Sequence, residues 1–191
     1  MESWIIWAIL GVIVVGLILI YNRLVSLRQK RNNSESDIDV QLKLRYNLVP
    51  QLVETVKGYA SHENEVFTKV TDARAQVGEA NKKAPENPER MNAEGVLGGA
   101  LMNLFAVAEN YPDLKADANF RELQRELSDI ENKIAAAIRF FNSATSEYNA
   151  ALQQFPAVLI AGPFGFKEED FFELDPTVAD AAQKAPDVNF T

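Results

Sequence analysis

The residue types that most often carry out chemistry are scarce in this chain. It has no Cys and a single His, His62, among its 191 residues. The lack of thiols excludes disulfide frameworks, thiolate metal sites, iron–sulfur clusters and cysteine nucleophiles. One imidazole cannot build a multi-histidine metal site, and it weakens the case for acid–base catalysis without excluding carboxylate chemistry.

A metal-dependent enzyme that uses carboxylates inside a helical bundle is the remote catalytic alternative. Di-metal bundles need Glu-x-x-His pairs on two helices, and one His cannot supply two pairs. Glu63 is the only acidic residue that we predict on a buried helix face. Gly95, Gly98 and Gly99 are not followed by the Lys-Ser or Lys-Thr of a phosphate loop, so we expect them to allow close approach between helices. We therefore predict no enzyme, no catalytic residue, no cofactor and no metal.

The charge of the chain is acidic overall but basic in one segment. With 19 Lys and Arg against 27 Asp and Glu, the net charge is −8, which argues against a nucleic-acid partner. Residues 23–45 reverse this balance with six basic and three acidic side chains. Such an asymmetry carries information about membrane topology.

The basic segment follows an uncharged, apolar stretch at residues 3–21. About 17 to 19 helical residues span roughly 26 to 28 Å, close to a bilayer core of about 30 Å. Trp4, Trp7 and Tyr21 lie near its ends, where aromatic rings favour the headgroup layer. A cleaved signal peptide would carry its basic residues before the apolar run, and here they follow it. We predict an uncleaved membrane anchor.

The positions of the basic residues predict its direction. Because Arg23, Arg28, Lys30 and Arg31 come after the span, the N-terminus is expected outside and the rest of the chain in the cytoplasm. These four side chains are also expected to face anionic lipid. A role as topology determinants alone is the other reading.

The remaining chain has the periodicity of long helices. Residues 38–77 keep an apolar heptad seam, interrupted by Arg45 and Glu63, which predicts one helix with a kink at Pro50. That kink should leave the Tyr46 carbonyl open for water, a side chain or a ligand. Asn47, one turn earlier, is expected to contact the disrupted backbone.

Two further helices are expected after an exposed connection at residues 78–88. One runs from about residue 88 to 109 with Asn87 as its cap. The other keeps a strict seam from Phe120 to Phe155 over five heptads and starts at a capping box formed by Asn119 and Glu122.

The chain therefore divides into four parts. We predict an anchor with a short outside N-terminus at 1–22, a basic juxtamembrane segment at 23–37, an all-α helical bundle at 38–173 and a disordered acidic tail at 174–191. Two questions stay open: whether the membrane helix continues through residues 22–37, and whether the cluster from Phe164 to Phe172 is packed on the core or forms a partner site.

Several irregular motifs resemble the LemA family. They are RYNLVPQLV at 45–53, VKGY at 56–59, ENYPDLK at 109–115, Asn119-Phe120, Leu123-Gln124, Phe155-Pro156 and Gly165-Phe166. The resemblance covers the anchor and roughly residues 20–173. It implies a single-pass protein of the bacterial inner membrane with a cytoplasmic, antiparallel, up-and-down bundle. It implies no catalytic activity, cofactor or substrate, and it gives the following motif residues structural roles: Tyr46, Asn47, Pro50, Tyr111, Pro112, Asp113, Asn119 and Phe120.

The function favoured by these features is a non-catalytic scaffold. Membrane lipid and a second copy of the chain are the expected partners, with another membrane protein as an open alternative. Self-assembly is suggested by an apolar seam of about 60 Å between residues 38 and 77. It is also suggested by Leu24, Val25 and Leu27, which have no obvious intramolecular neighbour. A membrane-remodelling or lipid-organising role is the second hypothesis.

Overall fold

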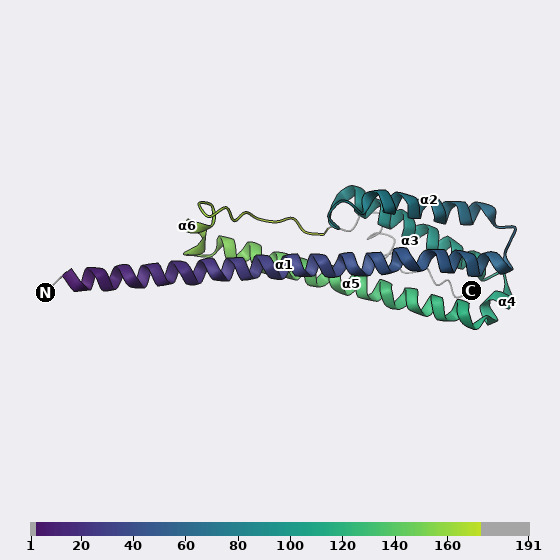
Figure 1. Ribbon diagram of the computed structural model, residues 1–191, viewed down its shortest axis with the longest axis horizontal. Coiled ribbons are helices and arrows are strands. Elements are labelled where there is room, and N and C mark those ends of the chain that lie inside the picture. The colour runs from purple at the N-terminus through teal and green to yellow at the C-terminus, as the bar shows by residue number, and fades with distance from the viewer. Residues whose placement is uncertain (1–2, 173–191) are drawn as a thin grey trace, which may run out of the picture. The chain divides into compact units, whose positions relative to one another are not determined.

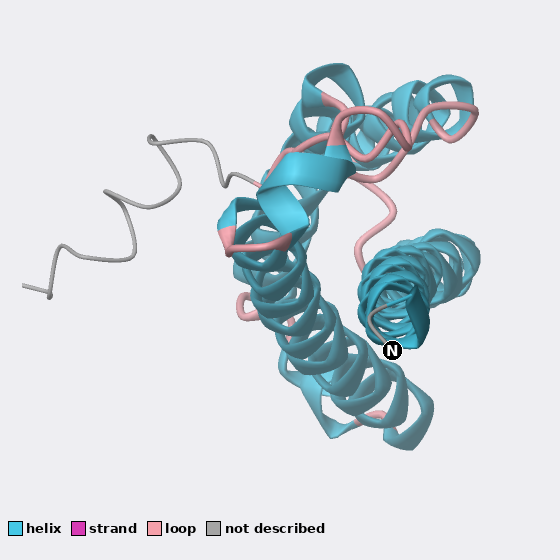
Figure 2. Ribbon diagram, turned by 90° about the vertical axis from the view of Figure 1, so that its left-hand side faces the viewer, coloured by secondary structure: helices cyan, strands magenta, loops and turns pink. Residues whose placement is uncertain are grey.

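Six helices make up the part of the chain described by the structure, residues 3–172 of a computed structural model (Figure 1). Their bounds are α1 Ser3–Tyr59, α2 Asn64–Ala80, α3 Pro88–Ala108, α4 Pro112–Ala116, α5 Ala118–Gln153 and α6 Ala157–Ala161. Every described element in Figure 2 is a helix or a loop. The all-α prediction is therefore confirmed for these residues, whereas the predicted tail at 174–191 lies outside them.

The first helix continues from the apolar stretch through residues 22–37 without a break. α1 is a single helix of 57 residues that includes both the apolar stretch and Pro50. Ser34 does not cap a new helix, because its hydroxyl donates to the Arg31 carbonyl of the same helix at 2.6 Å. The apolar stretch and the first bundle helix are thus one continuous helix.

The described residues group into two compact units. The first unit contains residues 3–37 and 137–171, and the second contains residues 38–136 with residue 172. α1 and α5 each contribute one part to each unit. The units are described separately below.

The prediction of one helix over residues 38–77 is wrong, because the second unit has two helices there. α1 ends at Tyr59, a turn follows, and α2 returns beside α1, so that Arg74 reaches Tyr46. α3 packs along α2. A single 60 Å seam does not exist, because its two halves belong to consecutive helices that run in opposite directions, each with its own buried residues. The breaking signal is the polar run from Ser61 to Asn64, which our reading of the heptads passed over.

The helix caps are partly as predicted. The Asn87 side chain accepts a hydrogen bond from the Glu89 backbone N–H at 3.1 Å and caps α3 as expected. The cap predicted at Asn119 is wrong. The Asp117 carboxylate instead accepts the Phe120 backbone N–H at 2.8 Å, which lowers the pKa of Asp117.

The long seam of α5 is buried along almost all of its predicted register. Its buried members are Phe120, Leu123, Leu127, Ile130, Ile134, Phe141, Ala144, Tyr148 and Ala151. Phe155 departs from the prediction, because it lies beyond the end of α5 and is 80% exposed.

The first unit has a core of its own. Leu24 and Leu27 of α1 are buried together with Tyr148 and Leu152 of α5, and with residues of the segment 157–166. These leucines therefore have intramolecular neighbours, contrary to our expectation. Phe166 is buried in this core and Phe164 is 58% exposed, so the Phe cluster is partly packed and partly open.

A substitution at Ile134 tests whether the α5 seam holds the second unit together. Ile134 is 7% exposed, so Ile134→Asp buries an unpaired charge and should cost several kcal/mol of stability. Limited proteolysis of the full chain should then cleave α5 rapidly. Ala135→Asp, at the exposed neighbouring position, is the matched control and should resist proteolysis like the wild type. Equal resistance of both variants would mean that the seam is not buried.

Candidate functional site

The most conspicuous surface of the first unit is the apolar part of α1. Fourteen large apolar or aromatic side chains between Trp4 and Tyr21 are exposed. The most apolar 18-residue window of this helix has a mean hydropathy of 2.7, and none of it is buried. By length and composition this stretch can cross a membrane. Trp4, Trp7 and Tyr21 lie at its two ends, where the sequence placed them as interfacial anchors.

A second helix, α3, is also long and apolar enough to cross a membrane, with a mean hydropathy of 1.2. It differs from the apolar part of α1 because 39% of its most apolar stretch is buried and because it carries the buried charges Arg90 and Glu94. α3 is thus a core helix of the second unit.

The four basic residues after the apolar stretch do not share one environment. Arg23 is exposed. Arg28 is half-buried with its guanidinium 5.0 Å from the Phe166 ring, and Lys30 pairs with Glu147 at 2.7 Å.

The prediction that Arg31 faces lipid is wrong. It is 4% exposed and lies 4.7 Å from the centre of the Phe141 ring. Its guanidinium is 3.5 Å from Glu35 and 3.7 Å from Glu169, and it donates to the Asp170 carbonyl. Arg31 therefore ties the segment after α6 to α1, because its position on the helix faces α5 rather than solvent.

The Tyr46 carbonyl, which cannot bond to Pro50, has another hydrogen-bond partner in the second unit. Pro50 has no N–H for the Tyr46 carbonyl, and Arg74 of α2 donates its Nε–H to that oxygen at 3.1 Å. The same guanidinium lies 3.9 Å from the centre of the Tyr46 ring. A side chain at Gly78 would meet the Tyr46 hydroxyl at 3.2 Å, so glycine lets this ring fit. The interaction that we assigned to Asn47 is thus made by Arg74, and Asn47 is exposed.

The motif around residues 111–114 closes a corner of the second unit. Tyr111 donates its hydroxyl to Glu63 at 3.0 Å, so Glu63 lies in the turn after α1 and not on a helix face. Pro112 begins α4, and Leu114 of that helix is fully buried. Asp113 and Asn119 are exposed, and the Asn119 amide donates to the Thr55 hydroxyl at 3.3 Å.

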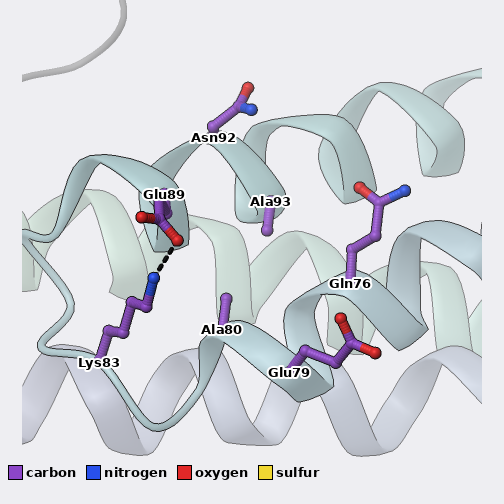
Figure 3. A pocket seen from close by; sticks show the side chains of 7 residues that line it. All are labelled: Gln76, Glu79, Ala80, Lys83, Glu89, Asn92 and Ala93. Atoms are coloured by element: carbon purple, nitrogen blue, oxygen red, sulfur yellow. Dashed lines mark hydrogen bonds and ion pairs between the residues drawn. The ribbon is translucent and has the colours of Figure 1, made fainter.

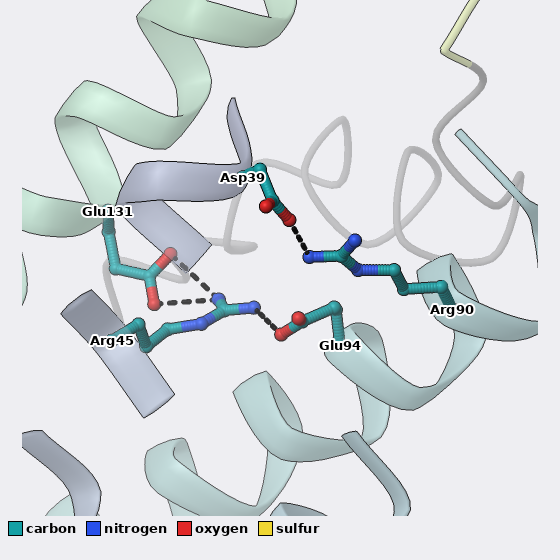
Figure 4. Close-up of polar contacts among 5 residues, drawn as sticks. All are labelled: Asp39, Arg45, Arg90, Glu94 and Glu131. Atoms are coloured by element: carbon teal, nitrogen blue, oxygen red, sulfur yellow. Dashed lines mark hydrogen bonds and ion pairs between the residues drawn. The ribbon is translucent and has the colours of Figure 1, made fainter. Parts of the chain in front are cut away.

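A group of charged residues, of which Arg45, Arg90 and Glu94 are buried, joins helices of the second unit (Figure 4). Arg45 of α1 is 6% exposed and donates to Glu94 of α3 at 2.6 Å and to Glu131 of α5 at 2.9 Å. Arg90 of α3 is 3% exposed, pairs with Asp39 of α1 and donates to the Lys83 carbonyl at 2.7 Å. These ion pairs join α1, α3 and α5.

Burial and pairing shift the pKa values of this group in defined directions. Burial raises the pKa of the Glu94 carboxyl above its usual range, although Arg45 counteracts it. Burial acts to lower the pKa of Arg45, but the carboxylates of Glu131 and Glu94 outweigh it and raise that pKa. A permanently charged guanidinium between two carboxylates is suited to holding helices in register, not to transferring protons.

Glu94 and Arg90 were missed by our sequence reading, although a signal was present. The buried register of Leu97, Leu101 and Leu104 extends backwards by steps of three and four to Glu94 and Arg90. Our reading of the sequence singled out neither residue. Glu63 is therefore not the only acidic residue to consider for the interior.

A shallow hollow between α2 and α3 is the other concave feature of the second unit (Figure 3). Its volume is about 340 Å³, and it is lined by Gln76, Glu79, Ala80, Lys83, Glu89, Asn92 and Ala93. Lys83 and Glu89 pair with each other across one end. Among residues 3–172, no group of three or more His, Asp or Glu side chains is placed to hold a metal ion. His62 is exposed in the turn between α1 and α2.

The role of the buried charges can be tested by comparing one substitution with two. Glu94→Ala leaves Arg45 buried with only the partly exposed Glu131, which should cost on the order of 3 kcal/mol. Arg45→Met combined with Glu94→Leu removes both charges and should recover most of that loss. Urea unfolding of the detergent-solubilised chain measures both values. A double variant as unstable as Glu94→Ala would show that the pair stabilises the bundle beyond mutual compensation.

Comparisons with known proteins agree with these features. The chain is 25% identical over 185 residues to magnetosome protein MamQ of Magnetospirillum gryphiswaldense, covering 85% of this chain and 68% of that protein. It is equally similar to magnetosome protein MamQ 1 of Paramagnetospirillum magneticum. It is also 28% identical over 134 residues to protein LemA of Metamycoplasma hominis, covering 70% of this chain and 60% of that protein. Since the family model described as LemA family matches residues 34–190, the chain belongs to the LemA family.

Proposed function

We propose that this protein is a non-catalytic, single-pass membrane scaffold whose helices lie on the cytoplasmic side of a bacterial inner membrane. The observation that carries the proposal is the exposed apolar part of α1, which belongs to the same helix as the first bundle segment. The charge step after Tyr21 supports an outside N-terminus, with Arg23 exposed directly after the span. The polar clusters of the second unit are engaged in holding helices together, which supports a structural role.

Self-assembly is part of the proposal, and its support comes from α3. The arguments from an uncovered 60 Å seam and from Leu24 and Leu27 no longer hold, because these residues are covered within the chain. The exposed face of α3 instead carries Asn92 and Asn103 together with small and apolar residues, namely Gly95, Val96, Gly99, Met102 and Ala106. A Cβ atom at Gly95, Gly98 or Gly99 would meet nothing within 4 Å, so these glycines do not serve packing inside the chain. They leave room for a second copy to approach closely, and a shared membrane orientation favours that encounter.

The topology can be tested with single cysteines, since the chain has none. Ser3→Cys should react with an impermeant thiol reagent in intact cells, because the N-terminus is expected outside. Ser146→Cys, exposed on α5, should react only after the cells are lysed. Labelling of Ser146→Cys in intact cells would overturn the proposed orientation.

Assembly can be tested by the native mass of the full chain in mild detergent and in nanodiscs. We expect a multiple of the 21.3 kDa protomer for the wild type. Gly99→Leu should release protomers, because it fills open space on α3 without an internal clash and improves helix propensity. Ala136→Leu, at an exposed position of α5, is the control and should leave the mass unchanged. A 21.3 kDa wild type in both media would remove self-assembly and favour a one-to-one adaptor.

A further inference from the structure

The segment that follows α5 in the first unit is apolar without interruption. Residues 155–166 read FPAVLIAGPFGF and contain no charged or hydrogen-bonding side chain. Four large hydrophobic side chains of this segment are exposed: Phe155 by 80%, Val158 by 51%, Leu159 by 65% and Phe164 by 58%. They are called the α6 patch below. An exposed cluster of this kind normally marks a contact with another apolar surface.

The α6 patch is held in place by the rest of the first unit. Ala157 and Ala161 form the inner side of α6 and are buried with Leu24. Gly165 adopts a φ of +76°, which glycine tolerates, next to the buried Phe166. Beyond it, Asn149 exchanges two hydrogen bonds with the Glu169 backbone, at 2.9 and 3.0 Å. The segment is thus fastened on both sides, while the four side chains of the α6 patch stay exposed.

The position of the α6 patch along α1 suggests its occupant. The Phe164 ring lies 5.4 Å from the Tyr21 ring in an edge contact. Phe155 lines a crevice with Ile20 and Arg23 of α1. Both contacts place the patch beside residues 20–23, where the apolar stretch of α1 ends and its charges begin.

We propose that the α6 patch inserts into the headgroup layer of the bilayer as a second membrane contact, beside the span of α1. The inference rests on the proposed span, because Tyr21 then marks the boundary of the bilayer. Aromatic and aliphatic side chains next to exposed cations are typical of surfaces that lie in this layer. The cations here are Arg23 and Lys167, both exposed. Three acidic residues follow Lys167: Glu168 accepts from Gln153 at 2.8 Å, Glu169 lies 3.7 Å from Arg31, and Asp170 is exposed.

This contact has a mechanical consequence. A single span leaves a helix free to rotate about its axis and to tilt in the bilayer. A second contact on one side of α1 fixes which side faces the membrane surface. The first unit is then oriented as well as tethered, so neighbouring copies present the same faces to one another.

The test uses full-length variants with one cysteine, labelled with bimane and reconstituted into phosphatidylethanolamine and phosphatidylglycerol vesicles. Leu159→Cys reports on the α6 patch, and its exposure means that the label does not disturb the core. Ile13→Cys reports on the span and Ser146→Cys on the water-exposed side of α5. Lipids spin-labelled near the headgroup quench a probe in the interface, lipids labelled deep in the chain quench one in the core, and iodide quenches one in water.

We expect the Leu159 probe to be quenched by the shallow lipid label and to lose the iodide quenching that the Ser146 probe shows. The Ile13 probe should respond to the deep label. A Leu159 probe that behaves like the Ser146 probe would overturn the second contact while leaving the span intact. Shielding of Leu159 from both lipid and iodide would overturn it too, because protein would then cover the patch. An Ile13 probe that no lipid quenches would overturn the proposed span and the second contact together.

Discussion

The apolar surface of residues 4–21 is the constraint on which the other features depend. Fourteen large side chains there are exposed to the surroundings of the chain. Keeping them in water costs on the order of 1.5 kcal/mol each at the lower end, or about 20 kcal/mol together, whereas a folded domain is stable by about 5 to 15 kcal/mol. No rearrangement of a small helical unit recovers such an amount. A bilayer is the environment that removes this surface from water and still satisfies the backbone, because a helix bonds its own peptide groups.

The continuity of α1 makes this constraint relevant to the whole protein. One helix carries the apolar stretch, the leucines that anchor α6 and the residues that organise the bundle. Two irregular positions in its second-unit part are compensated by neighbouring helices. Arg74 donates to the Tyr46 carbonyl that Pro50 cannot bond, and Glu94 and Glu131 neutralise the buried Arg45. Both compensations are specific in geometry, so they fix which helix lies beside α1 and in what register.

Sequence reasoning succeeded for features that depend on a local pattern of residues. The apolar stretch, the seam of α5 and the Asn87 cap were predictable because each depends on residues close in sequence. The open Tyr46 carbonyl followed from Pro50 alone, but its partner did not, because Arg74 arrives through the α1–α2 turn. That turn was missed because α1 and α2 both carry apolar residues in steps of three and four. This spacing looks the same whether the chain continues or reverses its direction. Arg31 was expected to face lipid because it follows the span, and Arg90 and Glu94 were not singled out. The helical positions of all three place them inside, where pairing makes burial tolerable. The candidate α6 patch was seen only as aromatic residues in irregular chain, since its neighbours on α1 lie more than a hundred residues away.

Spin labels placed one at a time along residues 4–40 of the full chain in vesicles test the central claim most directly. Accessibility to oxygen, which concentrates in lipid, and to a water-soluble nickel complex can be measured at each position. A membrane-spanning α1 predicts high oxygen accessibility up to about Tyr21, a crossover to water at Arg23, and a helical period of about 3.6 residues that continues through 22–37. Accessibility to the nickel complex throughout residues 4–20, or loss of the period at residues 32–34, would contradict a continuous membrane-spanning helix.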